Sequence, residues 1–230
     1  MSSNIMPDPV RLFHITAIDN LSDICASGGL VCKNICAAKG VSYQNIAHVG
    51  AQGARAAKHV PNPPGGTVHD YVPFYFAPRS PMLLAINGGK VTGCSLRQED
   101  ILHFETTVPH VVATGKETLF YDRNATLSFS TPYTDLNLMP SVIGWDMLTE
   151  PPELDGFCKY FQNRPTEPRY VDRMERRQAE FLVKDQVLLS SMTKIGVLNE
   201  EKAQIVRDIL SQSGIKLNVE VKTDWYFLGQ

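Results

Sequence analysis

The sequence lacks the features that mark membrane and secreted proteins. No apolar run approaches the roughly 18 residues that a membrane-spanning helix needs. The first residues, MSSNIMPDPVRL, have no apolar core of the kind found in signal peptides. We also find no internal repeat and no low-complexity tract. These absences predict a cytoplasmic, globular protein with no membrane partner.

Cysteine is scarce and its spacing is uninformative. The chain has five cysteines, an odd number, with no CxxC pair and no nearby histidine pair at zinc spacing. We therefore expect reduced, structural cysteines and no metal site. They are Cys25, Cys32, Cys36, Cys94 and Cys158.

The overall composition is that of an ordinary globular protein. Hydrophobic residues make up 43% of the 230 residues and charged residues 20%. This length fits one large domain or two small ones with a sizeable core. The formal net charge of −2 argues against a protein that coats nucleic acid through bulk electrostatics.

Acidic residues are absent from a long segment near the N-terminus. Between Asp23 and Asp70 the sequence contains no aspartate or glutamate. Two interpretations weigh about equally, a phosphate-facing loop and a flexible solvated linker. The lysine and arginine residues inside this segment are Lys33, Lys39, Arg55 and Lys58.

Periodicity and turn residues predict strands separated by short helices. We expect strands at 10–15, 30–32, 72–77, 101–106, 118–122, 180–187, 194–198 and 216–225. Cap and stop residues predict helices over 19–28, 80–88 and 199–214, with a short one near 142–149. Two long loops, about 34–70 and 123–177, remain, and loops of that length usually carry function or disorder. The pattern favours an α+β domain with a mixed or antiparallel sheet.

The segment RRQAEFLV, residues 176–183, places polar side chains against an apolar run. In a strand, Gln178, Glu180 and Leu182 would share one face, because side chains two residues apart point the same way. A strand whose first turn is still solvated explains this pattern without any chemistry. Alternatively, the amide and the acid point together into a functional cleft.

Three motifs give the chain a resemblance to a known family. They are FHIT at 13–16, PPGG-x-x-HDYVPFYF-x-PRSPML at 63–83, and QAEFLV at 178–183. Together they resemble the DarT family of DNA ADP-ribosyltransferase toxins, over about residues 10–227. The resemblance implies one ADP-ribosyltransferase domain spanning 1–230, with a split central β-sheet, flanking helices and long functional loops. It also implies NAD as co-substrate, single-stranded DNA as acceptor with thymidine as the most common base, and a DarG-type macrodomain antitoxin as partner.

The resemblance implies catalytic roles for two residues. Cleavage of the bond between nicotinamide and ribose passes through an oxocarbenium-like state, which a nearby carboxylate stabilises. Glu180 would supply that carboxylate and then take the proton of the acceptor base. Arg55, on its own an unremarkable surface cation, would contact NAD phosphate and the acceptor base through its fork of donors.

Other residues would bind the two substrates. His14 would hydrogen-bond a ribose hydroxyl of NAD, and Ile15 would hold the nicotinamide amide through its backbone. The Tyr75 ring would pack beside nicotinamide, although a plain core position explains it equally well. The NAD-binding set is completed by Thr16, Leu30 and Val31, and the DNA-binding set comprises Arg123, Asn124 and Gln178. Some relatives carry histidine at the position of Asn124.

Two other functions stay open at this stage. The same enzyme chemistry would serve a different acceptor, such as guanine in DNA, RNA or a protein. A non-catalytic module that binds NAD or nucleic acid is the second alternative. The joint presence of His14, Arg55 and Glu180 counts against that alternative, because binding alone does not require the carboxylate.

Overall fold

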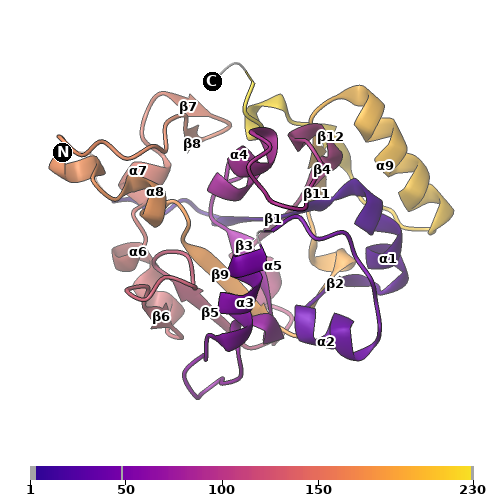
Figure 1. Ribbon diagram of the computed structural model, residues 1–230, viewed down its shortest axis with the longest axis horizontal. Coiled ribbons are helices and arrows are strands. Elements are labelled where there is room, and N and C mark those ends of the chain that lie inside the picture. Colours follow the sequence, from indigo (N-terminus) through magenta and orange to yellow (C-terminus); the bar gives the residue numbers. More distant parts are fainter. Residues whose placement is uncertain (1–3, 48, 229–230) are drawn as a thin grey trace.

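The computed structural model describes residues 4–47 and 49–228 (Figure 1). Within them, eight strands form one central sheet in the order β12, β11, β4, β1, β3, β9, β5 and β6. Their bounds in that order are Val219–Val221, Lys194–Val197, Ile101–Thr107, Arg11–Ala17, Tyr71–Tyr75, Glu180–Lys184, Thr118–Tyr121 and Pro132–Tyr133. Neighbouring strands are antiparallel except for β11 and β12, which run parallel. The predicted α+β class with a mixed sheet is confirmed.

The central sheet consists of two halves joined at a narrow contact. Strand β1 pairs with β4 from Arg11 opposite Thr107 to Ala17 opposite Ile101. On its other side, among the described residues, β1 pairs with β3 only where Phe13 stands opposite Tyr75. The strands diverge beyond that pair, so a split in the sheet opens there, as the resemblance implied.

Two small ribbons accompany the central sheet. Strand β2 (Gly29–Val31) pairs with β10 (Gln186–Leu188), and β7 (Glu153–Leu154) pairs with β8 (Phe157–Cys158). The predicted strand 180–187 is therefore two strands, β9 and β10, that belong to different sheets. Asp185, with a φ of 65°, turns the chain between them, a left-handed conformation that aspartate tolerates better than most residues.

Nine α-helices surround the sheet in the described residues. They are α1 (Leu21–Ala26), α2 (Lys33–Ala38), α3 (Val49–Ala57), α4 (Pro81–Asn87), α5 (Val108–Val112), α6 (Met139–Val142), α7 (Trp145–Leu148), α8 (Arg173–Arg176) and α9 (Glu200–Gln212). Short 3₁₀ turns are η1 (Ile18–Asn20), η2 (Val68–Asp70), η3 (Gln98–Asp100), η4 (Leu136–Leu138), η5 (Pro168–Tyr170), η6 (Leu189–Ser191) and η7 (Thr223–Trp225). In Figure 1, α1 and α9 lie together on one side of the sheet and α6, α7 and α8 on the other.

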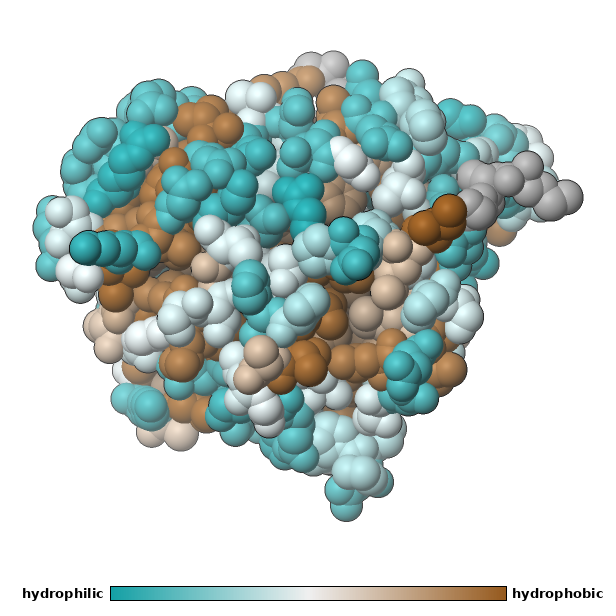
Figure 2. All heavy atoms as spheres, turned by 180° about the vertical axis from the view of Figure 1, so that it is seen from behind, coloured by the Kyte–Doolittle hydropathy of each residue, from teal (hydrophilic) through white to brown (hydrophobic). Residues whose placement is uncertain are grey.

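The two strongest helix signals in the sequence are confirmed. Helix α4 follows Ser80, whose side chain accepts a hydrogen bond from the Leu83 amide, and Pro81 is its first residue. Helix α9 buries Ala203, Val206 and Leu210 at helical spacing. Figure 2, which shows the opposite face of the molecule, has hydrophilic side chains gathered over α9.

Two expectations about the irregular segments are wrong. The presumed loops 34–70 and 123–177 contain α2, α3 and η2, and η4, α6, α7, η5 and α8, respectively. Of these, α7 confirms the short helix predicted near 142–149. Most of these elements are shorter than the two or three turns that periodicity needs. Helix α3 (VGAQGARAA) contains two glycines, which weaken its helix signal. The predicted final strand over 216–225 is also shorter, since β12 covers only Val219–Val221.

The core distributes the residues of β9 between two apolar clusters. Phe181 and Val183 belong to the main core, whereas Leu182 belongs to a smaller cluster. The other members of that smaller cluster are Val60, Val68, Tyr71, Leu119, Tyr121 and Ala125. The alternation predicted along this strand therefore holds from Glu180 onward.

None of the helices in the described part of the chain has the length and apolarity that crossing a bilayer requires.

Candidate active site

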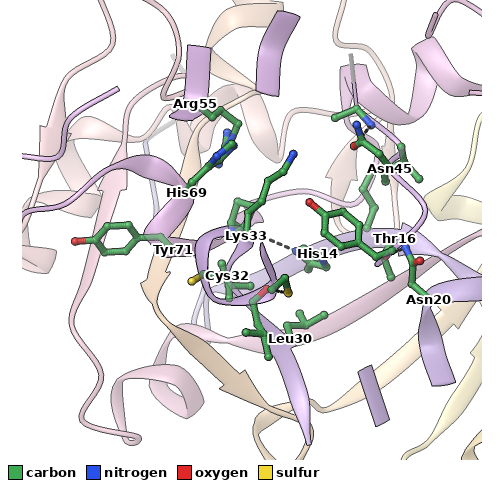
Figure 3. A pocket seen from close by; sticks show the side chains of 18 of the residues that line it. His14, Thr16, Asn20, Leu30, Cys32, Lys33, Asn45, Arg55, His69 and Tyr71 are labelled. Atoms are coloured by element: carbon green, nitrogen blue, oxygen red, sulfur yellow. Dashed lines mark hydrogen bonds between the residues drawn. The ribbon is translucent and has the colours of Figure 1, made fainter. Parts of the chain in front are cut away.

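A pocket lies where the two halves of the sheet separate (Figure 3). Strands β1, β2, β3 and β9, helices α2 and α3 and the turn η2 all contribute to its wall. Polar residues of the wall include His14, Asn20, Lys33, Gln52, Arg55, His69, Tyr75, Asn124 and Glu180. The pocket thus gathers side chains that are far apart in the sequence.

Glu180 and Arg55 form an ion pair inside this pocket. The Nη1 atom of Arg55 donates to both carboxylate oxygens of Glu180, at 3.0 and 2.8 Å. The Glu180 side chain is 1% exposed and the Arg55 side chain 13%. The Nη2 atom of Arg55 is buried, and no hydrogen-bond partner for it exists among the described residues. One arm of the guanidinium therefore fixes the carboxylate, and the other keeps a free donor.

Two tyrosines stand on either side of Glu180 in the sheet. Tyr75 of β3 and Tyr121 of β5 are its register partners. Burial raises the pKa of Tyr75, and the Glu180 charge adds to the effect. Burial and the same charge raise the pKa of Tyr121 to about 12. Both phenols stay protonated at neutral pH, and within the described residues the Tyr121 hydroxyl has no hydrogen-bond partner.

His14 reaches the pocket from β1 with a defined tautomer. Burial lowers its pKa to about 4, and the charge of Arg55 contributes in the same direction. The ring is therefore neutral at pH 7. Its Nδ1 lies 2.8 Å from the carbonyl oxygen of Pro73, which can only accept, so Nδ1 carries the proton. Nε2 is left with a lone pair that can accept a hydrogen bond.

The residues after His14 continue along the pocket. Ile15 is buried, and the Thr16 hydroxyl oxygen accepts a hydrogen bond of 3.0 Å from the Asn20 amide nitrogen. Asn20 directly precedes α1, yet its side chain caps no helix and instead binds Thr16 and the backbone of Gln44. These contacts fix the segment that joins β1 to α1 along one side of the pocket (Figure 3).

A cationic side of the pocket is organised by Gln52. Its Oε1 accepts from Lys33 Nζ at 2.6 Å and lies 3.1 Å from His69 Nε2. Burial, with the charge of Arg55, lowers the pKa of Lys33. Burial and the charges of Lys33 and Arg55 lower the pKa of His69 to about 4. Figure 3 shows Arg55 and His69 close together, with the Lys33 side chain beside them. Among the described residues, Arg55 forms an ion pair only with Glu180 and Lys33 forms none, so these two close cations favour an anionic ligand.

Most of the residues that the resemblance implies meet in this one pocket. Those that line it are His14, Ile15, Thr16, Leu30, Val31, Arg55, Tyr75, Asn124 and Glu180. Arg123 and Gln178 lie outside its lining in the described structure. Arg123 forms ion pairs with Asp122 and, at 2.8 Å, with Asp172.

Gln178 does not share a strand face with Glu180. Strand β9 begins at Glu180, and Gln178 lies in the turn that follows α8, where its backbone amide donates to Glu175. Its side chain accepts a weak bond of 3.5 Å from Asn124, which does line the pocket. The proposed face-sharing is therefore wrong, because a helical turn ends only one residue before the strand.

Two polar residues of the pocket, Gln52 and His69, received no role from the sequence. Both fall in the acid-free segment. The basic character of that segment was the available signal, since Lys33 and Arg55 do line the pocket whereas Lys39 and Lys58 do not.

The described residues contain no group of three or more His, Cys, Asp or Glu side chains that could hold a metal ion.

Comparison with known proteins agrees with this geometry. Residues 13–227 match a family described as ssDNA thymidine ADP-ribosyltransferase, DarT. A DNA ADP-ribosyl transferase of Thermus sp. (strain 2.9) is 34% identical over 228 residues, which cover 96% of this chain and 98% of that protein.

Two solved structures extend the similarity to the fold. Thermus sp. 2.9 DarT in complex with ADP-ribosylated ssDNA superposes with a TM-score of 0.85 at 31% identity, covering 98% of this chain and 100% of that chain. The complex of the same protein with NAD+ gives a TM-score of 0.79 at 31% identity, covering 96% and 99% of the two chains. From the family match, the Thermus sequence and the shared fold, we conclude that the chain belongs to the ssDNA thymidine ADP-ribosyltransferase (DarT) family.

Proposed function

We propose that this chain transfers ADP-ribose from NAD to thymidine in single-stranded DNA, and that it is the toxin partner of a DarG-type macrodomain antitoxin. We place its action in the cytoplasm. The observation that carries the proposal is the buried Arg55–Glu180 ion pair, which lies in one pocket with the acceptor nitrogen of His14. The Thermus proteins of similar fold, in complexes with NAD+ and with ADP-ribosylated ssDNA, support it.

The pocket offers a complementary group for each part of NAD. Nε2 of His14 accepts from a ribose hydroxyl, and the Ile15 backbone holds the nicotinamide amide. The Tyr75 ring packs beside nicotinamide. Lys33 and the free Nη2 of Arg55 face the diphosphate, where charge-assisted hydrogen bonds are strongest. Thr16, Leu30 and Val31 border the same ligand.

Glu180 acts on the bond that breaks. As the bond between nicotinamide and ribose C1′ cleaves, nicotinamide leaves with the electron pair and positive charge grows on the ribose. The carboxylate stabilises that charge more in the transition state than in the ground state. The ring nitrogen of the acceptor base then bonds to C1′, and Glu180 takes the proton that this nitrogen releases. Arg55 offsets the negative charge that develops on the base.

The acceptor reaches the pocket from the side of β5. Asn124 lines the pocket, and its Oδ1 is fixed by the amide and hydroxyl of Thr126 at 3.0 and 2.7 Å. Its Nδ2 approaches Gln178. We assign contacts with the target nucleotide to Asn124 and Gln178, and a contact with the DNA backbone to Arg123. Both halves of the sheet build one pocket, which supports a single working domain over residues 1–230.

The test is a transfer assay with a matched carboxylate control. The purified chain is incubated with NAD and mixed-sequence single-stranded oligonucleotides. Mass spectrometry then measures the mass of the products, and fragmentation locates the modified base. We expect a mass gain of one ADP-ribose on thymidine, its loss in Glu180→Gln, and normal activity in Glu117→Gln, whose side chain is 53% exposed. Absence of any mass gain from folded protein would refute the proposal.

The same assay separates the alternatives. Oligonucleotides that each lack one base, an RNA oligonucleotide and a protein extract identify a different acceptor by the product that gains mass. If the chain is a non-catalytic binding module, the wild-type protein would bind NAD but would modify none of these acceptors.

A further inference from the structure

The loop between β5 and β6, residues 122–131, presents an exposed aromatic ring. Phe129 is 60% exposed, which is unusual for phenylalanine but not in itself evidence of a function. Its neighbours in the loop are polar, and the loop is short and internally bonded. The question is why an apolar ring is held in water at this position.

The ring of Phe129 is held by an arginine that is itself fixed. The Cζ atom of Arg123 lies 5.7 Å from the ring centroid, within the range of a cation–π contact. Arg123 is clamped by Asp122 and, at 2.8 Å, by Asp172. Asp122 also accepts a bond of 2.8 Å from the Thr131 amide, which closes the loop. The ring and guanidinium therefore form a preorganised surface rather than a mobile side chain.

This surface is continuous with the pocket. Asn124 and Thr126 of the same loop line the pocket. Two backbone bonds, from Leu127 to Asn124 at 3.1 Å and from Ser130 to Leu127 at 3.2 Å, carry the chain from there to the ring in compact turns. Phe129 therefore lies only three residues along this loop from Thr126, which lines the pocket.

Two further cations contact this loop or the carboxylate that holds Arg123. Nε of the exposed Arg176 lies 3.1 Å from the carboxylate of Asp172, which also binds Arg123. Nζ of Lys58 donates to the Leu127 carbonyl at 3.4 Å. An aromatic ring between basic side chains is the combination by which proteins hold single strands, with bases stacked on rings and phosphates near cations.

We propose that Phe129, backed by Arg123, is a stacking platform for a base next to the target nucleotide in single-stranded DNA. The inference rests on the proposed function and adds a residue that determines which strands are held, outside the pocket where the chemistry occurs. Stacking is tolerant of base identity, so the platform sets affinity and the minimum length of the acceptor rather than the modified base.

Kinetics of four proteins test the platform. Wild type, Phe129→Ala, Phe129→Tyr and Tyr160→Ala are compared, with oligonucleotide varied at saturating NAD and then NAD varied at saturating oligonucleotide. Tyr160 is the matched control, because it is a 43% exposed ring beneath Arg164, at 6.0 Å, in another loop. Thermal melting checks that each variant folds.

Loss of the ring should weaken the binding of DNA and leave the binding of NAD unaffected. We expect Phe129→Ala to raise KM for the oligonucleotide about tenfold, and KM for NAD to stay within about twofold. Phe129→Tyr keeps a stacking face and should behave as wild type, as should Tyr160→Ala. An oligonucleotide KM that Phe129→Ala leaves unchanged, or that Tyr160→Ala raises equally, would overturn the inference.

An abasic scan identifies the base that stacks. Each nucleotide beside the target thymidine is replaced in turn by an abasic site. With the wild-type protein, an abasic site at one position should raise KM for the oligonucleotide by about the same factor as Phe129→Ala does. The same abasic site should not raise KM further for the Phe129→Ala variant. If the abasic site raised KM by the same factor in wild type and in Phe129→Ala at every position, the stacking platform would be contradicted. Failure of wild type on every oligonucleotide would instead refute the proposed function, so the two failures are distinct.

Discussion

Nη1 of Arg55 lies 2.8 Å from Oε2 of Glu180, although the two residues are 125 positions apart in sequence. This contact joins α3 to β9, and the Glu180 side chain is almost completely buried. The guanidinium holds the carboxylate in one orientation. In the proposed mechanism, the same guanidinium also faces the acceptor base.

Arg55→Lys should reduce turnover strongly. Lysine keeps the charge but replaces two donor nitrogens in a planar fork with one ammonium, so it cannot hold Glu180 and meet a substrate oxygen together. We expect kcat to fall on the order of 10²-fold, measured by ADP-ribose transfer to an oligonucleotide. Arg164→Lys, at an exposed position, is the control. A lysine variant that keeps wild-type kcat would contradict a role for the fork.

Lys33→Ala should weaken the binding of NAD. Lys33 extends into the pocket and donates to Gln52, whereas Lys39 is exposed and lies outside the lining. Loss of one charge-assisted contact with a diphosphate should raise the Kd about tenfold or more, as measured by titration calorimetry. Lys39→Ala should leave the Kd unchanged. Equal effects of the two substitutions would show only a nonspecific electrostatic contribution.

Stability should fall as the solution becomes mildly acidic. Burial lowers the pKa of His14 to about 4 and that of His103 to about 3, whereas both rings titrate near 6.5 in an unfolded chain. Below pH 6.5 the unfolded chain therefore binds more protons than the folded chain. The free energy of unfolding should decrease as the pH falls from 7 to 5, by up to about 1.4 kcal/mol per pH unit for each buried ring.

Urea denaturation at a series of pH values measures this slope. Replacing a buried ring by glutamine should flatten the slope, in His14→Gln and, if it folds, in His103→Gln. His59→Gln, at an exposed position, should leave it unchanged. A wild-type stability that is constant between pH 7 and 5 would contradict the buried neutral histidines.

Gly29→Ala should destabilise the wall of the pocket. Strand β2 pairs with β10, and a β-carbon at Gly29 would overlap the backbone of Val187 and Leu188. We expect a loss of about 2 kcal/mol or more of unfolding free energy, because backbone atoms cannot move aside cheaply.

Gly53→Ala provides the contrast. Nothing lies within 4 Å of a β-carbon at Gly53 of α3, so alanine there should stabilise the protein by about 0.5–1 kcal/mol through helix propensity. Chemical denaturation compares both variants with wild type. Equal changes of the same sign would contradict the close packing of β2 against β10.

Local patterns of the sequence determined much of the framework. Ser80 with Pro81 marked the start of α4, and short apolar runs identified β1, β3, β4 and β9. These features depend on neighbours within a few residues, so periodicity and capping chemistry are sufficient to predict them. The motifs added the family resemblance, and through it the candidate residues of the active site.

The tertiary structure alone decided where the two candidate catalytic groups meet. Helix α3 contains two glycines, which weaken its helix signal, yet it carries Arg55 to within hydrogen-bonding distance of Glu180. Likewise, the divergence of β1 from β3 beyond Phe13 and Tyr75 opens the pocket. Strand register and helix placement arise from contacts between distant segments. The local periodicity of apolar residues contains no information about such contacts.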